Sequence, residues 1–94
     1  MALSDFSEFP GGELIRRGLE DLAEARESRE ALLVLVGAPR LRRLGFNIPE
    51  VNGIPPEHRL YDVLRRSDPD GAHSQYNALI RRLVRFERAV ECAA

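Results

Sequence analysis

Apolar residues recur three and four positions apart along most of this chain, with charged residues between them. Such spacing places the apolar side chains on one face of an α-helix. The pattern predicts helices at residues 13–27, 29–37, 39–45, 57–66 and 70–92. A lead of residues 1–12 precedes them, and proline and glycine residues indicate an ordered loop at residues 47–56. We therefore expect residues 1–94 to form a single all-α domain, a compact bundle of four to five helices.

The last predicted helix has the most regular apolar pattern. One seam along it contains Tyr76, Leu79, Leu83, Phe86 and Val90, spaced 3, 4, 3 and 4 apart. We expect the other helices to wrap around this one. The residues predicted to form the core are Leu14, Leu22, Leu33, Leu60, Leu64, Leu79, Leu83 and Phe86.

The apolar segment at residues 31–36 has two interpretations. Its sequence, Ala-Leu-Leu-Val-Leu-Val, is too short for periodicity to separate a buried helix from a buried strand. Ser28 is a good helix N-cap, and no other segment resembles a strand that could pair with this one. Because a lone strand leaves its backbone polar groups unpaired, the helix is favoured.

Three smaller features lead to further expectations. Gly18 lies inside the first predicted helix, where we interpret it as a merely tolerated glycine rather than a close helix crossing. Phe6 and Phe9 should fold back as a cap on the core. Val51 and Ile54 should anchor the 47–56 loop through burial.

Charged residues form two rows with the same helical spacing. Glu20, Glu24 and Glu27 are spaced i, i+4, i+7 in the first predicted helix, and the last predicted helix repeats this spacing in Arg81, Arg85 and Arg88. The rows could pair with each other within one chain, pair across a dimer, or face solvent independently.

The apolar surface of the last helix also suggests self-association. Ile80 and Val84 widen its seam beyond what one neighbouring helix would cover. Surplus apolar surface on a small domain commonly binds a partner. We therefore predict a homodimer whose interface contains Ile80, Val84, Arg81, Arg85, Arg88, Glu20, Glu24 and Glu27.

The composition is that of a globular domain without disulfides or a membrane-spanning helix. Hydrophobic residues make up 44% of the chain and charged residues 31%, as in ordinary globular domains. Cys92 is the one cysteine, which excludes an internal disulfide and fits a reducing compartment. The N-terminal residues lack a basic stretch followed by an apolar one, and the chain has no apolar run long enough for a membrane helix. A cytoplasmic location is expected.

Nucleic-acid binding is the alternative function. Residues 31–48 contain three arginines, Arg40, Arg42 and Arg43, and no acid. They follow a turn, in an order that resembles a helix-turn-helix only superficially. The net charge of the chain is −1, so it has no overall basic field that would attract nucleic acid.

An enzyme is the third possibility, and the sequence offers little chemistry for it. His58 has Asp62 one helical turn away, and Cys92 would need a histidine within hydrogen-bond reach to act as a nucleophile. Zinc sites need three or four converging ligands, and no such spacing occurs here. We expect no catalytic residue, metal or cofactor. The predicted function is that of a small non-enzymatic protein–protein interaction or homodimerisation module.

Overall fold

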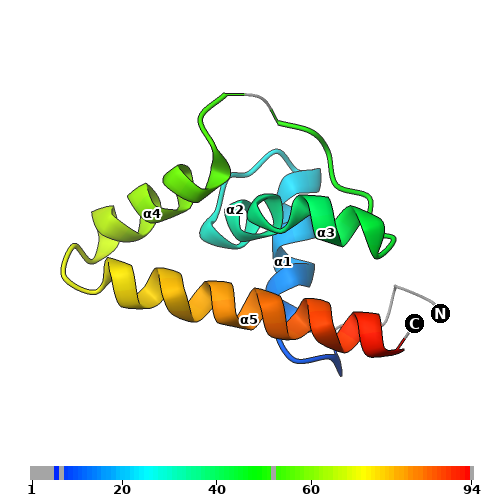
Figure 1. Cartoon of the computed structure of the whole chain (residues 1–94). Coiled ribbons are helices and arrows are strands. Elements are labelled where there is room, and N and C mark those ends of the chain that lie inside the picture. Colours follow the sequence, from blue (N-terminus) through cyan, green and yellow to red (C-terminus); the bar gives the residue numbers. More distant parts are fainter. Residues whose placement is uncertain (1–5, 7, 52, 94) are drawn as a thin grey trace.

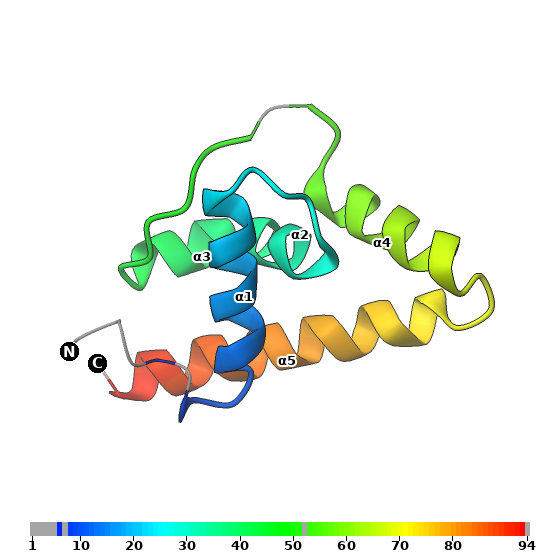
Figure 2. The same ribbon diagram turned by 180° about the vertical axis from the view of Figure 1, so that it is seen from behind.

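The protein is an all-α bundle, as predicted from its apolar spacing. A computed structural model describes residues 6, 8–51 and 53–93, and within these residues it has no strand. The helices of this described part are α1 (Gly12–Ala23), α2 (Arg29–Val36), α3 (Ala38–Arg43), α4 (Pro56–Ser67) and α5 (Ala72–Ala93). Helices α2, α3 and α4 lie along one side of α5, and α1 crosses the bundle (Figures 1 and 2).

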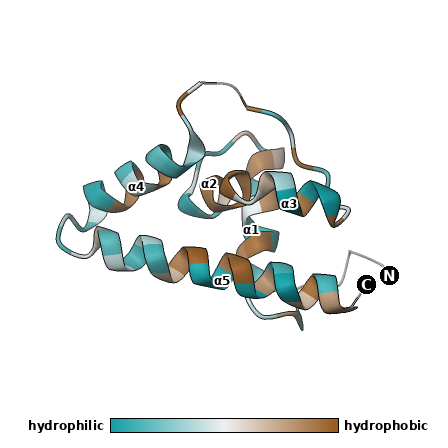
Figure 3. Cartoon of the chain, viewed as in Figure 1, coloured by the Kyte–Doolittle hydropathy of each residue, from teal (hydrophilic) through white to brown (hydrophobic). Residues whose placement is uncertain are grey.

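Segment 31–36 is helical, and α2 forms the centre of the bundle. The main-chain N–H of Ala31 donates to the Ser28 hydroxyl at 3.0 Å, so Ser28 caps the helix as expected. Residues 31–35 are all buried, and α2 packs against every other helix. In Figure 3 it is the most uniformly hydrophobic helix.

The expectation that the bundle wraps around α5 is therefore wrong. A helix that is apolar on all sides can be surrounded completely, whereas α5 has arginines on one face that remain in water. Its opposite face supplies the apolar seam, of which Leu83, Phe86 and Val90 are buried.

The predicted core is mostly confirmed. Of the eight residues expected there, Leu33, Leu60, Leu64, Leu79, Leu83 and Phe86 are buried. Leu14 and Leu22 are only half-buried, which corrects the prediction for α1. Ile15, fully shielded from solvent, is the apolar side chain that α1 inserts into the core.

The phenylalanines of the lead cap the core as expected. The ring of Phe6 is buried, with its centroid 5.2 Å from that of Phe46 and 5.8 Å from that of Phe86 in edge-to-face contacts. Phe9 contacts Phe86 in the same geometry, at 6.4 Å. Such contacts add roughly 0.5–1.5 kcal/mol beyond burial. Residues 1–5 and 7 of the predicted lead lie outside the described residues.

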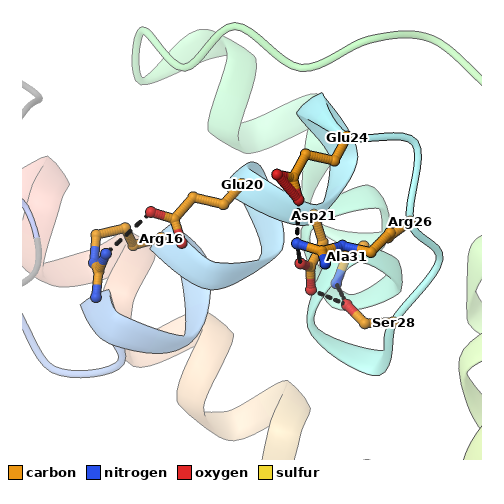
Figure 4. A network of polar contacts seen from close by, with 7 residues as sticks. All are labelled: Arg16, Glu20, Asp21, Glu24, Arg26, Ser28 and Ala31. Atoms are coloured by element: carbon orange, nitrogen blue, oxygen red, sulfur yellow. Dashed lines mark hydrogen bonds and ion pairs between the residues drawn. The ribbon is translucent and has the colours of Figure 1, made fainter.

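Helix α1 ends at Ala23, four residues before the predicted end (Figure 4). Ala25 has a left-handed backbone with φ 58°, and the Arg26 N–H donates to the carbonyl of Asp21 at 2.7 Å. The Ala25 N–H donates to the carbonyl of Leu22 at 3.1 Å, which completes a Schellman motif. This motif reverses the chain toward α2, so residues 24–27 are not helical. The other helix bounds agree with the prediction within about two residues.

Gly18 marks a close crossing of α1 and α2, so its interpretation as a merely tolerated glycine is wrong. A Cβ added at Gly18 would lie 2.5 Å from Cγ2 of Val34 and closer still to the main-chain carbonyl oxygen of Glu30. Only a residue without a side chain lets the two helices approach this closely.

The loop between α3 and α4 is anchored differently from the prediction. Val51 and Ile54 are 51% and 65% exposed, so they do not anchor it. Phe46 and Ile48, which precede them, are buried. The guanidinium of Arg42 also donates to the loop carbonyls of Ile48 and Pro49. Asn52, part of the predicted turn, lies outside the described residues.

Candidate interaction surface on α5

The outward face of α5 presents a row of arginines to solvent. Arg81, Arg85 and Arg88, here called the arginine row, are all exposed. At 100° per residue they fall within about 60° of one another, and their Cα atoms span roughly 10.5 Å along the helix axis. The buried seam of α5 occupies the opposite face. Burial of that seam therefore fixes the direction in which the row points.

No carboxylate of the described residues forms an ion pair with the arginine row. The same holds for Arg82, an exposed neighbour about 100° around the helix from Arg81. In contrast, Arg16, Arg26 and Arg40 each bind two carboxylates. Among the residues that the structure describes, the α5 arginines thus have no carboxylate partner.

The two acids of α5 face α3. One guanidinium nitrogen of Arg40 lies 3.7 Å from Glu87 Oε1, and another lies 3.2 Å from Glu91 Oε2. Glu87 is 4% exposed, and its burial raises the pKa of its carboxyl group, while the charges of Arg40 and Arg43 lower that pKa. Helix α5 therefore separates its charges, with the acids turned toward Arg40 and the arginines toward solvent.

The predicted glutamate row does not exist as a continuous helix face. Glu20 lies on α1 and accepts from Arg16 at 3.1 Å, whereas Glu24 and Glu27 lie beyond the end of that helix. Glu24 pairs with Arg26 (Figure 4), and Glu27 pairs with Arg59 of α4. Within the chain the two rows therefore do not pair with each other, which excludes the first of the three arrangements that the sequence allows.

Ile80 and Val84 flank the arginine row on the side that turns toward the core. Ile80 is half-buried and packs against the core cluster, and Val84 is half-buried as well. The surplus apolar width predicted for α5 is thus partly covered within one chain. What remains is an apolar edge beside the row.

The three arginines of the nucleic-acid alternative have separate environments. Arg40 binds the two α5 acids, as above. Arg42 donates from Nε to the carbonyl of Ile48 at 3.0 Å and from Nη2 to that of Pro49 at 2.9 Å. Arg43 is exposed. Two of the three guanidinium groups therefore hold the fold together.

The two residues of the enzyme alternative lie far apart. His58 is in the first turn of α4, where it lines a cleft with Tyr76 near the start of α5. Cys92 is exposed near the other end of α5, about 24 Å from Tyr76 at 1.5 Å per residue. The structure does not bring them together. The described residues contain no group of three or more metal-ligating side chains that could hold a metal ion.

Two features escaped the sequence reasoning. Arg82 lies off the i, i+4, i+7 spacing that defines the row, although its place directly after Arg81 in the last predicted helix is a signal for it. Tyr61 and Tyr76 come from different helices, and no sequence spacing predicts their contact at 5.9 Å between ring centroids.

None of the described helices has both the length and the apolar character needed to cross a lipid bilayer. The chain has no significant match to a family model, a curated protein or a solved structure.

Proposed function

We propose that this chain is a non-enzymatic interaction module that binds an acidic helix of a partner protein through the arginine row. One observation carries the proposal: α5 turns its acids toward Arg40 and leaves the three arginines of the row exposed, without an ion pair to any described residue. Charges arranged in this way add little to the fold, because exposed arginines need no compensation in water. They are available to a partner.

The spacing of the row favours a helix as the binding element. Carboxylates at i, i+4 and i+7 of a partner helix would repeat the axial spacing of Arg81, Arg85 and Arg88. Arginine suits this role because its planar guanidinium binds a carboxylate through two hydrogen bonds. Val84, half-buried beside the row, offers the partner an apolar contact.

Nucleic acid is the rival ligand, and the arrangement supports it less well. The net charge of −1 gives no general attraction for phosphates, and Arg40 and Arg42 are occupied within the fold. A functional site for DNA in the Arg40–Arg43 segment would have to break those contacts. No observation favours it over the protein partner.

Self-association through the same face of α5 is the alternative to binding a different protein. In a two-fold dimer through α5 the arginine rows would approach each other and need acids between them. The acids expected to supply this charge, Glu20, Glu24 and Glu27, pair with Arg16, Arg26 and Arg59 respectively. We therefore favour a different protein as the partner. Light scattering at micromolar concentration should give the mass of one chain, whereas the mass of two chains would support the homodimer.

The experiment is calorimetric titration with two designed helical peptides of identical composition. One peptide has glutamates at i, i+4 and i+7, and the other distributes them around the helix. With three exposed pairs contributing about 0.5–1 kcal/mol each, the aligned peptide should bind at least about tenfold tighter. Replacing Arg81, Arg85 and Arg88 by glutamine should remove this preference.

The matched control replaces Arg17 and Arg66, which are exposed and have no ion pair within the described part of the chain. This change should leave the preference intact. Equal affinity for both peptides, or equal loss in the control variant, would contradict the proposal. Salt-sensitive binding of duplex DNA would favour the rival if it disappears on joint mutation of Arg40, Arg42 and Arg43 in a variant that keeps the helical content of the wild type.

A further inference from the structure

A cleft of about 380 Å³ lies between the beginning of α4 and the beginning of α5. Its lining residues are Glu57, His58, Tyr61, Asp62 and Tyr76. It is separate from the arginine row, because Tyr76 precedes Arg81 by five residues on α5 and lies about 140° around the helix from it. The proposed function leaves this cleft unused.

Two tyrosine rings form one wall of the cleft. Tyr61 and Tyr76 are half-buried, with ring centroids 5.9 Å apart and planes inclined at 60°. They are the two tyrosines of the chain, which contains no tryptophan. The face of an aromatic ring is electron-rich and attracts a cation placed within about 6 Å of its centre. Two inclined rings can contact one small cation together.

Two carboxylates add negative charge at the same place. Glu57 and Asp62 line the cleft, and no arginine does. Arg65 binds one oxygen of Asp62 at 3.2 Å from the next turn of α4, where both side chains are at least half exposed. Burial raises the pKa of the Tyr76 phenol, and the negative charge of Glu57 raises it further. This second cause agrees with the position of Glu57 in the lining of the same cleft.

We propose that the Tyr61–Tyr76 cleft binds an alkylammonium group, held against the two rings and balanced by Glu57 and Asp62. An alkylammonium ion suits the cleft because its methyl or methylene groups pack on aromatic rings while its charge meets the carboxylates. A metal ion does not, since the described residues assemble no set of three ligands for one. The cation can come from a free small molecule or from a lysine side chain.

The test uses tyrosine fluorescence, which reports on this cleft alone because both tyrosines line it. The full chain is titrated with choline, with its uncharged isostere 3,3-dimethylbutan-1-ol, and with N-acetyl-lysine amide. Choline should give a saturable change at least about fivefold tighter than the isostere. Saturation by the lysine amide as well would identify protein lysines as a source, whereas saturation by choline alone would identify a free quaternary ammonium compound.

Variants separate the contribution of the aromatic rings to choline binding from that of the carboxylates. Tyr76→Leu and the double variant Glu57→Gln, Asp62→Asn should each weaken choline binding by about threefold or more, while Tyr76→Phe, which keeps the ring, should restore it. Asp70→Asn is the matched control, an exposed acid that does not line the cleft. Equal binding of choline and its isostere, no saturable change, or equal weakening by Asp70→Asn would overturn the proposal.

Discussion

Gly18 of α1 lies directly against Val34 of α2, so closely that a methyl group added at Gly18 would come within 2.5 Å of the Val34 Cγ2 atom. The carbonyl of Glu30 lies on the same side and cannot move without disturbing α2. Gly18→Ala should therefore destabilise the protein by about 1–3 kcal/mol, as overpacking does. Urea denaturation measures this. A gain of about 1 kcal/mol, usual for alanine at an unhindered helical glycine, would contradict the close crossing.

The end of α1 predicts an effect of the opposite sign. Ala25 adopts φ 58°, a conformation that glycine reaches without strain. Ala25→Gly should raise the free energy of unfolding by about 0.5–1 kcal/mol. Ala23→Gly is the matched control, because Ala23 is exposed in the last helical turn and the change there should cost about 1 kcal/mol. Destabilisation by both changes would show that α1 continues past Ala23.

Arg42 tethers the loop that follows α3. Its guanidinium donates to the carbonyls of Ile48 and Pro49, so Arg42→Ala removes two hydrogen bonds made by a charged donor. The expected loss is about 1–3 kcal/mol, with faster amide hydrogen exchange at Phe46 and Ile48. The neighbouring Arg43 is exposed. Arg43→Ala should leave the free energy of unfolding within about 0.5 kcal/mol of the wild type, with no faster exchange at these two amides. Similar effects of the two changes would count against the tether.

Glu87 should make stability depend on pH. Burial raises the pKa of its carboxyl group above the ordinary value of 4.5, although the charges of Arg40 and Arg43 lower it and that of Glu91 raises it. The folded state therefore holds this proton more tightly than the unfolded chain does. As pH rises from about 4.5 through the raised pKa, the contribution of the protonated group to stability is lost.

Glu87→Gln tests this dependence. Glutamine resembles the protonated acid and does not titrate, so the free energy of unfolding of the wild type relative to Glu87→Gln should fall as pH rises above about 4.5. Denaturation at several pH values measures the difference. Glu91→Gln is the control, because Glu91 is an exposed acid that pairs with Arg40 as Glu87 does. A relative stability that rises with pH would show that pairing with Arg40 outweighs burial.

The helices could be predicted from the sequence because each buries a stripe of apolar side chains. Leu60 and Leu64 on α4, and Leu83 and Phe86 on α5, show this spacing and are buried. The end of α1 could not be predicted, since Ala25 in a left-handed conformation gives no glycine signal. That single turn also removes Glu24 and Glu27 from the helix and breaks the predicted glutamate row.

The candidate site could be predicted only in part. Exposure of Arg81, Arg85 and Arg88 follows from their position opposite the apolar seam. Their lack of ion pairs to any described carboxylate depends in part on α3, because α3 places Arg40 against the acids of α5. Long-range pairings of this kind, like the contact of Tyr61 with Tyr76, arise from tertiary packing and leave no local pattern.

A charge-swap titration tests the central claim that the arginine row binds an acidic helix. In the variant Arg81→Glu, Arg85→Glu, Arg88→Glu, binding of the aligned glutamate peptide should be lost. A peptide with arginine at the same three positions should bind this variant and not the wild type, because pairing across the interface is restored. Restored affinity within about tenfold of the original pair is the predicted result. Failure of the arginine peptide to bind a correctly folded variant would contradict the account.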